Sequence, residues 1–414
     1  MVSFTRFTLD NGLKVIVNHD NSTPLTAFNL LYNSGSRHED PEMTGMAHIL
    51  EHLMFTGTEE VPEYDFPLQL AGGENNAFTG NDVTDYYITI PSDNIETAFW
   101  LESDRMSRLE LTQKSLDIQR NVVIEEFRQR YLNQPYGDAM LILRPLAYRV
   151  HPYRWPTIGM NVSHLENATL ERVKDFYRSN YFPGNAILAI SGNTTPDLAH
   201  DLAVKWFGQV EKKEGMQIRI PREPEQKEER IMSAERDVPS DALFRAWHIC
   251  GRNSSDFRAL DLITDILAGG ESGRLYTRLV RERNIFSEIN TWLTSDTDPG
   301  LAILSGKLMK GISFDHAVRA VEEVFDDLKN KKIPVKEVNK VKNKYEASTL
   351  LSNTSALNKA MSLSLFELLG DADMINSEVS LFREISRESI MDTATKYFTA
   401  SNCSTLFYKS TQKT

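Results

Sequence analysis

Hydrophobic and polar positions divide the chain into two sets with the same order. In the first half, the apolar run LTAFNLLYNSGSR at residues 25–37 ends in a loop of glycine and serine, and a helical pattern follows it. In the second half, the run DALFRAWHICGRN at residues 241–253 leads into a helical pattern at 256–270. Apolar runs bounded by turn residues favour strands, and apolar positions three and four residues apart favour helices. We therefore predict two α+β halves related by internal duplication.

Each predicted half also ends in a strand-like run. YFPGNAILAISGN, which begins at Tyr181, fills this place in the first half, and YFTASNCSTLFYK, which begins at Tyr397, fills it in the second. Between the two halves, residues 211–230 are polar and charged and contain two prolines, which is the composition of a linker. The predicted division is a first domain at 1–215, a linker at 216–232 and a second domain at 233–414.

One helical stretch, GMAHILEHLMFTGT at residues 45–58, contains two histidines and a glutamate in the order His-x-x-Glu-His. Because an α-helix turns by about 100° per residue, His48, Glu51 and His52 project from one face. Phe55 lies on the same face, where we expect it to contact a substrate. The opposite face carries the apolar residues Met46, Ile49, Leu50 and Leu53.

The spacing of this motif favours a metal site. Two neutral imidazoles four residues apart on a helix can bind one Zn²⁺ ion at about 2.0–2.1 Å. A lone histidine on a helix is more often structural, but the order His-x-x-Glu-His is the signature of the inverted zinc peptidases. Three protein ligands and a water molecule would leave such a site open for catalysis.

The third ligand is expected on the helical pattern SLDIQRNVVIEEFRQRY at residues 115–131, which contains the adjacent carboxylates Glu125 and Glu126. The apolar face of this pattern comprises Leu116, Val123, Phe127 and Tyr131. Glu126 lies at the edge of that face and Glu125 lies opposite to it. Adjacent glutamates are usually solvent-exposed, but the histidine motif calls for a further ligand, and the periodicity selects Glu126.

These residues predict a zinc metalloendopeptidase with one zinc ion per chain. If His48, His52 and Glu126 bind the ion, the carboxylate of Glu51 stays free beside it. Zinc lowers the pKa of its bound water toward about 7 and polarises a carbonyl group, so this water is the expected nucleophile. Glu51 would then act as the general base and pass the proton to the leaving amine of a peptide bond.

Composition and charge narrow the remaining classes of function. A chain of 414 residues exceeds one ordinary hydrophobic core, which agrees with two domains. The formal net charge of −12 argues against a nucleic-acid partner, because phosphate binding requires a basic face. No apolar run approaches the roughly 18 residues that span a bilayer, so we expect no membrane span.

The cysteine content bears on the compartment. Cys250 and Cys403 are the only cysteines, and both lie in apolar, strand-like stretches where buried free thiols are common. A disulfide framework is not expected, and a reducing compartment is favoured. The strand pattern FTRFTLDNGLKVIV begins almost at Met1, without a signal peptide before it. We expect a cytoplasmic location; a periplasmic or organellar one would require a targeting segment that has been removed.

Four blocks of the sequence resemble the pitrilysin and mitochondrial processing peptidase family of inverted-motif zinc peptidases. The blocks are HILEHLMFTGT, GGENNAFTGNDVTDYY, QRNVVIEEF and YFPGNAILAISGN, and their order and spacing match that family. The resemblance implies two homologous α/β sandwich domains, each a mostly antiparallel sheet covered by helices. It also implies that halves from one long chain, or from two short chains, enclose an unfolded peptide in a chamber. His48, His52 and Glu126 correspond to the zinc ligands of the family, and Glu51 to its base.

The resemblance also implies substrate-binding residues. Asn76 and Ala77 match an edge strand whose backbone pairs with the substrate as an added strand. From the sequence alone, NAFTGND is equally compatible with an ordinary hairpin turn. In the second half, Arg281 of GRLYTRLVRERNIFSEINTW matches an arginine that holds the substrate backbone. A plain surface arginine is the alternative for this position.

The chain departs from the family pattern at two places. The family has a second glutamate seven residues before the third ligand, and here that position is Gln119, which can form hydrogen bonds but supplies no charge. The family also has a tyrosine several residues after the arginine, and here Ser287 or Glu288 takes its place. A complete metal site with an incomplete substrate clamp predicts a heterodimer with a related chain, with a homodimer as the alternative.

Two other classes of function compete with a peptidase. The first is a noncatalytic structural or assembly subunit of a related two-chain complex, but such subunits usually lose metal-site residues, and this chain keeps all four. The second is a zinc-dependent binding protein without turnover, which would not need Glu51 beside the metal. The complete set of four residues favours the peptidase.

Overall fold

The computed structural model describes residues 1–213 and 219–412. The chain forms two compact units, and each is assembled from three separate segments. The first unit contains residues 1–127, 155–220 and 349–378, and the second contains 128–154, 221–348 and 379–414. The predicted domains at 1–215 and 233–414 are contiguous and remain a prediction. The boundary at 215 and the start of the predicted linker, 216–218, lie outside the described residues.

The first unit is built on a six-stranded sheet. Its strands, in spatial order, are β1 (Thr5–Thr8), β2 (Lys14–His19), β6 (Ala186–Gly192), β3 (Leu25–Tyr32), β5 (Thr84–Pro91) and β4 (Glu74–Thr79). The described neighbours pair antiparallel, except for the parallel pair of β2 and β6. β4 therefore lies at one edge of the sheet, and no strand among the described residues pairs with its outer side.

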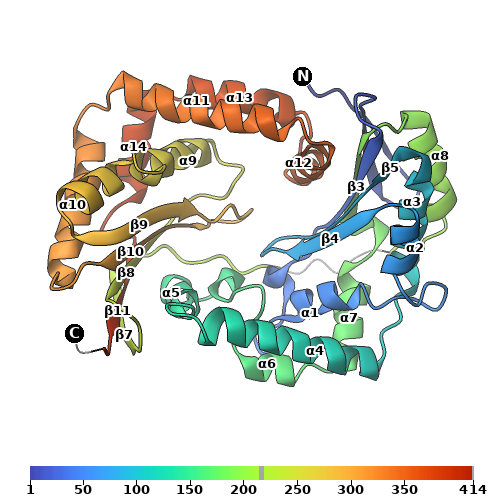
Figure 1. Cartoon of the computed structure of the whole chain (residues 1–414), viewed down its shortest axis with the longest axis horizontal. Coiled ribbons are helices and arrows are strands. Elements are labelled where there is room, and N and C mark those ends of the chain that lie inside the picture. The colour runs from blue at the N-terminus through green and yellow to red at the C-terminus, as the bar shows by residue number, and fades with distance from the viewer. Residues whose placement is uncertain (214–218, 413–414) are drawn as a thin grey trace. The chain divides into compact units, whose positions relative to one another are not determined.

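Helices cover both faces of this sheet (Figure 1). Side chains alternate between the faces along a strand. On β3, Ala27 packs in the core with residues of α12 (Ala356–Leu368), while Phe28 contacts Phe99 of α3 (Ile95–Arg108) and Phe207 of α8 (Pro196–Phe207). The predicted sandwich of helices on an antiparallel sheet is confirmed in this unit.

The second unit repeats this topology with five strands. They are β7 (Arg230–Arg236), β11 (Cys403–Ser410), β8 (Ala242–His248), β10 (Leu301–Leu308) and β9 (Phe286–Leu293), in spatial order. β7 and β11 are parallel and the other described neighbours are antiparallel, as for β2, β6, β3, β5 and β4 in the first unit. The predicted internal duplication is therefore confirmed, and β9 is the edge strand that corresponds to β4.

Helices from both halves of the sequence cover the second sheet as well. One face packs against α9 (Ser255–Ala268), α10 (Phe314–Asn330) and α14 (Arg387–Tyr397). The other face packs against α5 (Ala139–Ala147), which comes from the first half of the sequence. In the same way α12, from the second half, covers the sheet of the first unit. Each half therefore contributes helical residues to the unit built mainly by the other half.

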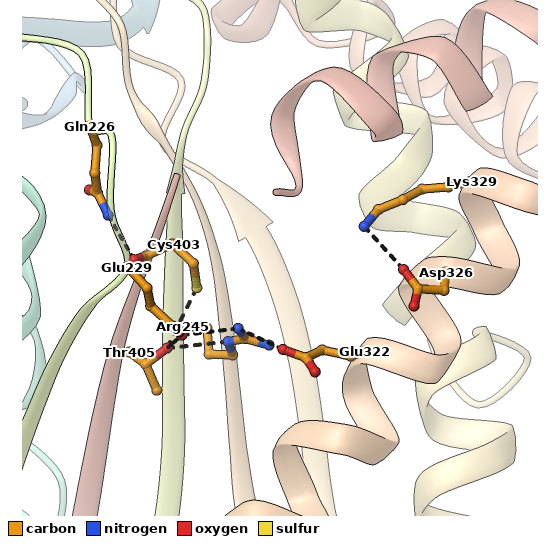
Figure 2. A network of polar contacts seen from close by, with 8 residues as sticks. All are labelled: Gln226, Glu229, Arg245, Glu322, Asp326, Lys329, Cys403 and Thr405. Atoms are coloured by element: carbon orange, nitrogen blue, oxygen red, sulfur yellow. Dashed lines mark hydrogen bonds and ion pairs between the residues drawn. The ribbon is translucent and has the colours of Figure 1, made fainter. Parts of the chain in front are cut away.

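A buried arginine joins the second sheet to the helix α10 (Figure 2). Arg245 on β8 is only 2% exposed; its guanidinium forms an ion pair with Glu322 on α10 at 3.2 Å and donates to the Thr405 hydroxyl on β11 at 3.3 Å. The thiol of Cys403 lies 3.5 Å from the same hydroxyl, and burial raises the pKa of this thiol. Cys403 and the half-buried Cys250 are both free.

The described residues form further helices in addition to those that cover the sheets. The α-helices are α1 (Met46–Leu53), α2 (Asp65–Leu70), α4 (Gln113–Phe127), α6 (Val162–Glu166), α7 (Leu170–Asn180), α11 (Val335–Ser352) and α13 (Met374–Glu384). Turns of π-helix lie at Arg128–Leu132 and Tyr276–Glu282, and turns of 3₁₀-helix at Ser36–His38, Ser92–Asn94, Pro152–Arg154 and Pro183–Asn185. Within the described residues, each helix is too short or too polar to cross a bilayer.

Candidate metal centre

The His-x-x-Glu-His motif lies on α1, as its periodicity predicts. His48, Glu51 and His52 are half-buried, whereas the apolar residues of the opposite face are buried in the core of the first unit. The helix ends at Leu53, so its polar face is only two turns long. A short helix of this kind depends on its surroundings for stability.

The first turn of α1 is held by a buried carboxylate. Glu39 is 6% exposed, and its two oxygens accept hydrogen bonds from the backbone N–H groups of Gly45 at 2.9 Å and Ala47 at 2.8 Å. These N–H groups have no partner within the helix. Burial raises the pKa of Glu39 to about 8, although both hydrogen bonds favour the charged form. This contact has no local sequence signature, because Glu39 lies six residues before Gly45, beyond the usual capping position.

Gly45 itself has a special backbone conformation. Its φ is 96°, in the left-handed region that glycine tolerates best. A Cβ atom added there would lie 2.7 Å from the carbonyl oxygen of Ile158. The start of α1 is therefore fixed by close backbone packing as well as by Glu39.

The third predicted ligand lies beside the two histidines. Glu126 is half-buried near the end of α4, and its Oε2 atom lies 3.0 Å from His48 Nε2 and 3.6 Å from His52 Nε2. Glu125 is exposed. The ligand atoms of His48, His52 and Glu126 all lie within 4.8 Å of one another, and the described residues contain no other group of three or more side chains suited to a metal ion.

This arrangement fits a zinc ion. Four ligands at about 2.0–2.1 Å in tetrahedral geometry are separated from one another by roughly 3.3 Å. The separations of Glu126 Oε2 from the two imidazole nitrogens, 3.0 and 3.6 Å, bracket this value. Two imidazoles and one carboxylate are also a donor set that catalytic zinc sites use.

The electrostatics of the group favour positive charge. Burial alone would lower the pKa of His48, but hydrogen bonds with Glu126 and Glu51 raise it to about 9. Burial alone would raise the pKa of Glu51, but its hydrogen bonds with His48 and Thr79 hold it below its usual range. Carboxylates that stabilise a proton on an imidazole in this way would also stabilise a divalent cation.

Asn76 and Ala77 lie within edge strand β4, so the structure favours the strand over a hairpin turn at these positions. The turn follows β4, where Gly80 N–H donates to Val83 O at 2.7 Å. The Ala77 N–H is not used by the ladder to β5; it donates to Oδ1 of Asn76 at 2.8 Å. The side chain of Asn76 thus accepts the hydrogen bond of a backbone N–H at the free edge of the sheet, and another acceptor could replace it there.

The other predicted site residues have separate surroundings. Phe55 follows α1, is half-buried and packs edge-on against Tyr64, with ring centroids 5.6 Å apart. Gln119 is half-buried on α4, two turns before Glu126. Arg281 belongs to the second unit and is exposed on the π-helical turn Tyr276–Glu282.

Arg281 differs from the nearby arginines of the sequence in its ion pairing. Arg274, Arg278 and Arg283 form ion pairs with Glu337, Asp327 and Glu323, at 2.6, 2.5 and 2.6 Å. Arg281 forms no ion pair with any residue that the structure describes. Its guanidinium is therefore available to a ligand, whereas the other three arginines stabilise the unit.

The fold and the site together define a duplicated α+β protein with an inverted zinc-peptidase motif on one half. Residues 14–152 match the family model described as insulinase (peptidase family M16), and residues 167–345 match the model described as the peptidase M16 inactive domain. The chain belongs to peptidase family M16. The resemblance to the pitrilysin and mitochondrial processing peptidase family is thereby confirmed.

Similar proteins match this chain over half of its length or more. The zinc protease PqqE of Helicobacter pylori is 27% identical over 410 residues, which cover 97% of this chain and 92% of the relative. The mitochondrial-processing peptidase subunit beta of Saccharomyces cerevisiae is 27% identical over 220 residues, covering 52% of this chain and 47% of the relative. The crystal structure of a protease from Helicobacter pylori matches with a TM-score of 0.93 at 26% identity, over 99% of this chain and 100% of that chain.

Proposed function

We propose that this chain is a zinc metalloendopeptidase that cleaves unfolded peptides or short polypeptides. The observation that carries the proposal is the convergence of three ligand side chains, His48, His52 and Glu126, around one point, with the carboxylate of Glu51 beside them. A metal site with a structural role alone would not require a fourth, unligated carboxylate. The names of the relatives as zinc proteases support the same class of enzyme.

The division of labour follows from the positions of these side chains. Zinc bound by the three ligands would activate a water molecule and polarise the scissile carbonyl group. The Oε2 atom of Glu51 lies 3.4 Å from His48 Nδ1, and this carboxylate would accept a proton from that water. The carboxyl group of Glu51 would then donate that proton to the leaving amine, which would regenerate the base.

The edge strand supplies the binding mode. An extended peptide can add to the free edge of β4, and its carbonyl groups can accept hydrogen bonds from donors such as the Ala77 N–H. Only an extended backbone can form such a ladder. This requirement supports unfolded peptides as substrates, because most backbone N–H and C=O groups of a folded domain are already paired within its own structure.

A related chain would complete the enzyme. The chain has the three candidate zinc ligands and the exposed Arg281. However, Ser287 or Glu288 occupies the position where the family has the tyrosine of its substrate clamp. The yeast relative is itself named as a subunit. We infer a heterodimer in which the partner supplies the missing phenol and helps to close a chamber around the peptide; a homodimer is the alternative.

A noncatalytic subunit is the competing function. One observation favours it: residues 167–345 match a family model described as an inactive domain. That range begins after His48, His52 and Glu126, so the match to the inactive domain does not include the candidate zinc ligands. The peptidase is therefore the better-supported function.

Replacing Glu51 by Gln tests the proposal, with Glu63→Gln as a matched control on an exposed residue outside the site. We expect about one zinc per chain in the wild type and in both variants. We expect the wild type and Glu63→Gln to cleave an unfolded peptide library, and Glu51→Gln to lose at least about 100-fold in turnover. Turnover of Glu51→Gln within tenfold of the wild type would refute the role of the base. A zinc-loaded wild type that cleaves nothing, alone or with the related chain, would favour the noncatalytic subunit.

A further inference from the structure

The last residue of the edge strand contacts the proposed base. Thr79 ends β4, and its hydroxyl lies 2.5 Å from Oε2 of Glu51 on α1. Both side chains are half-buried. Because an ionised carboxylate can only accept hydrogen bonds, the Thr79 hydroxyl is the donor. A hydrogen bond from a hydroxyl to a carboxylate at this distance belongs to the strong, charge-assisted kind.

This contact makes the two oxygens of Glu51 unequal. Oε2 accepts the Thr79 hydroxyl and also lies 3.4 Å from His48 Nδ1. Within the part of the chain that the structure describes, Oε1 forms no hydrogen bond. The carboxylate is thus held through one oxygen, while the other keeps its lone pairs for an incoming proton. A freely rotating carboxylate would present either oxygen and would lose catalytic geometry.

The position of Thr79 also connects the base to the edge strand. Ala77 and Thr79 are two residues apart on β4, so their side chains project to the same face, toward α1. The Ala77 N–H lies at the free edge of the same strand. The short stretch of β4 from Ala77 to Thr79 would therefore fix the position of a paired peptide relative to Glu51.

We propose that Thr79 is a positioning residue for the base: its hydroxyl fixes Oε2 of Glu51 and leaves Oε1 to take the proton from the attacking water. This inference rests on the proposed function. It assigns to Thr79 a role that acts through Glu51, and it makes the β4–α1 contact part of the catalytic geometry.

The test compares Thr79→Val, which removes the hydroxyl at nearly the same size, with Thr79→Ser, which keeps it. Thr89→Val, on the neighbouring strand β5 opposite Glu74, is the control for a threonine change in this sheet. We expect Thr79→Val to lower kcat by about 10- to 100-fold with KM within twofold of the wild type. Thr79→Ser should keep kcat within threefold, and Thr89→Val should behave as the wild type.

Zinc affinity provides a readout that does not depend on activity. In chelator competition, Thr79→Val should bind zinc within threefold of the wild type, because the three ligands are untouched. A tenfold loss of affinity would assign Thr79 to the structure of the metal site and overturn the inference. An equal fall of kcat in Thr79→Val and Thr79→Ser, or no fall in Thr79→Val, would also overturn it while leaving the proposed function intact. A wild type without any peptidase activity would instead refute the proposed function, and this inference with it.

Discussion

The ammonium group of Lys359 forms an ion pair with the carboxylate of Asp20, which precedes it by 339 positions in the sequence. Lys359 is buried on α12, and Asp20 follows β2 in the first unit. The pair therefore joins a helix from the second half of the sequence to the sheet built by the first half. Hydrogen bonds from Lys359 and then Ser22 hold the pKa of Asp20 well below its usual range.

Replacing Asp20 by Asn should loosen α12 in a pH-dependent way. At pH 7 the variant leaves the Lys359 ammonium buried without its partner, which we expect to destabilise α12 by about 1–3 kcal/mol. Because the pKa of Asp20 is lower in the folded state, its contribution is fully present above the usual aspartate pKa of about 3.9. The contribution is lost as the pH falls through that value and below it.

Hydrogen exchange of the α12 amides measures this effect. The difference between wild type and Asp20→Asn should be largest near neutral pH and should shrink below about pH 4. Asp10→Asn, at an exposed position in the same unit, is the control and should have no effect. A difference that stays constant between pH 7 and pH 3 would show that the charge of Asp20 does not stabilise the docking of α12.

The two adjacent glutamates of α4 should differ sharply in zinc binding. Glu126→Gln should weaken zinc affinity by more than about 100-fold, because it removes one of three protein ligands. Glu125→Gln, which changes an exposed side chain on the same helix, should stay within threefold of the wild type. Chelator competition measures both affinities. Equal values would refute the assignment of Glu126, and a larger loss at Glu125 would reverse it.

The free edge of β4 can be tested by removing a single donor. Ala77→Pro deletes the N–H that points away from β5 and should lower kcat/KM for an unfolded peptide by about tenfold. Ala77→Gly keeps this N–H and should lower kcat/KM by less than threefold. Zinc affinity should not change in either variant. If Ala77→Pro cleaves as well as Ala77→Gly does, peptides do not pair with this edge at Ala77.

The incomplete clamp predicts that this chain cleaves weakly by itself. Addition of a related chain that carries both the arginine and the tyrosine should raise peptide cleavage at least tenfold and give a one-to-one complex in size-exclusion chromatography. The added chain would supply the phenol that Ser287 and Glu288 lack. A stable homodimer with full activity that no partner increases would rule out the heterodimer.

Sequence alone was informative where the chemistry is local. His48, Glu51 and His52 lie within two turns of one helix, so the geometry of the helix places them together whatever surrounds it. The choice of Glu126 over Glu125 followed from the apolar periodicity of α4, because a helix buries one stripe and exposes the opposite one. The duplication was also visible, because strands and helices repeat in the same order.

Other features depend on contacts between segments that are far apart in the sequence. α5 and α12 cover sheets built mainly by the opposite halves of the sequence, and no local pattern specifies which sheet a helix covers. The contacts of Glu39 with the first turn of α1, and of Thr79 with Glu51, have no local signature either. A short-range pattern determines which face of an element is apolar or polar. Only tertiary packing brings a particular donor within hydrogen-bond distance of a particular carboxylate.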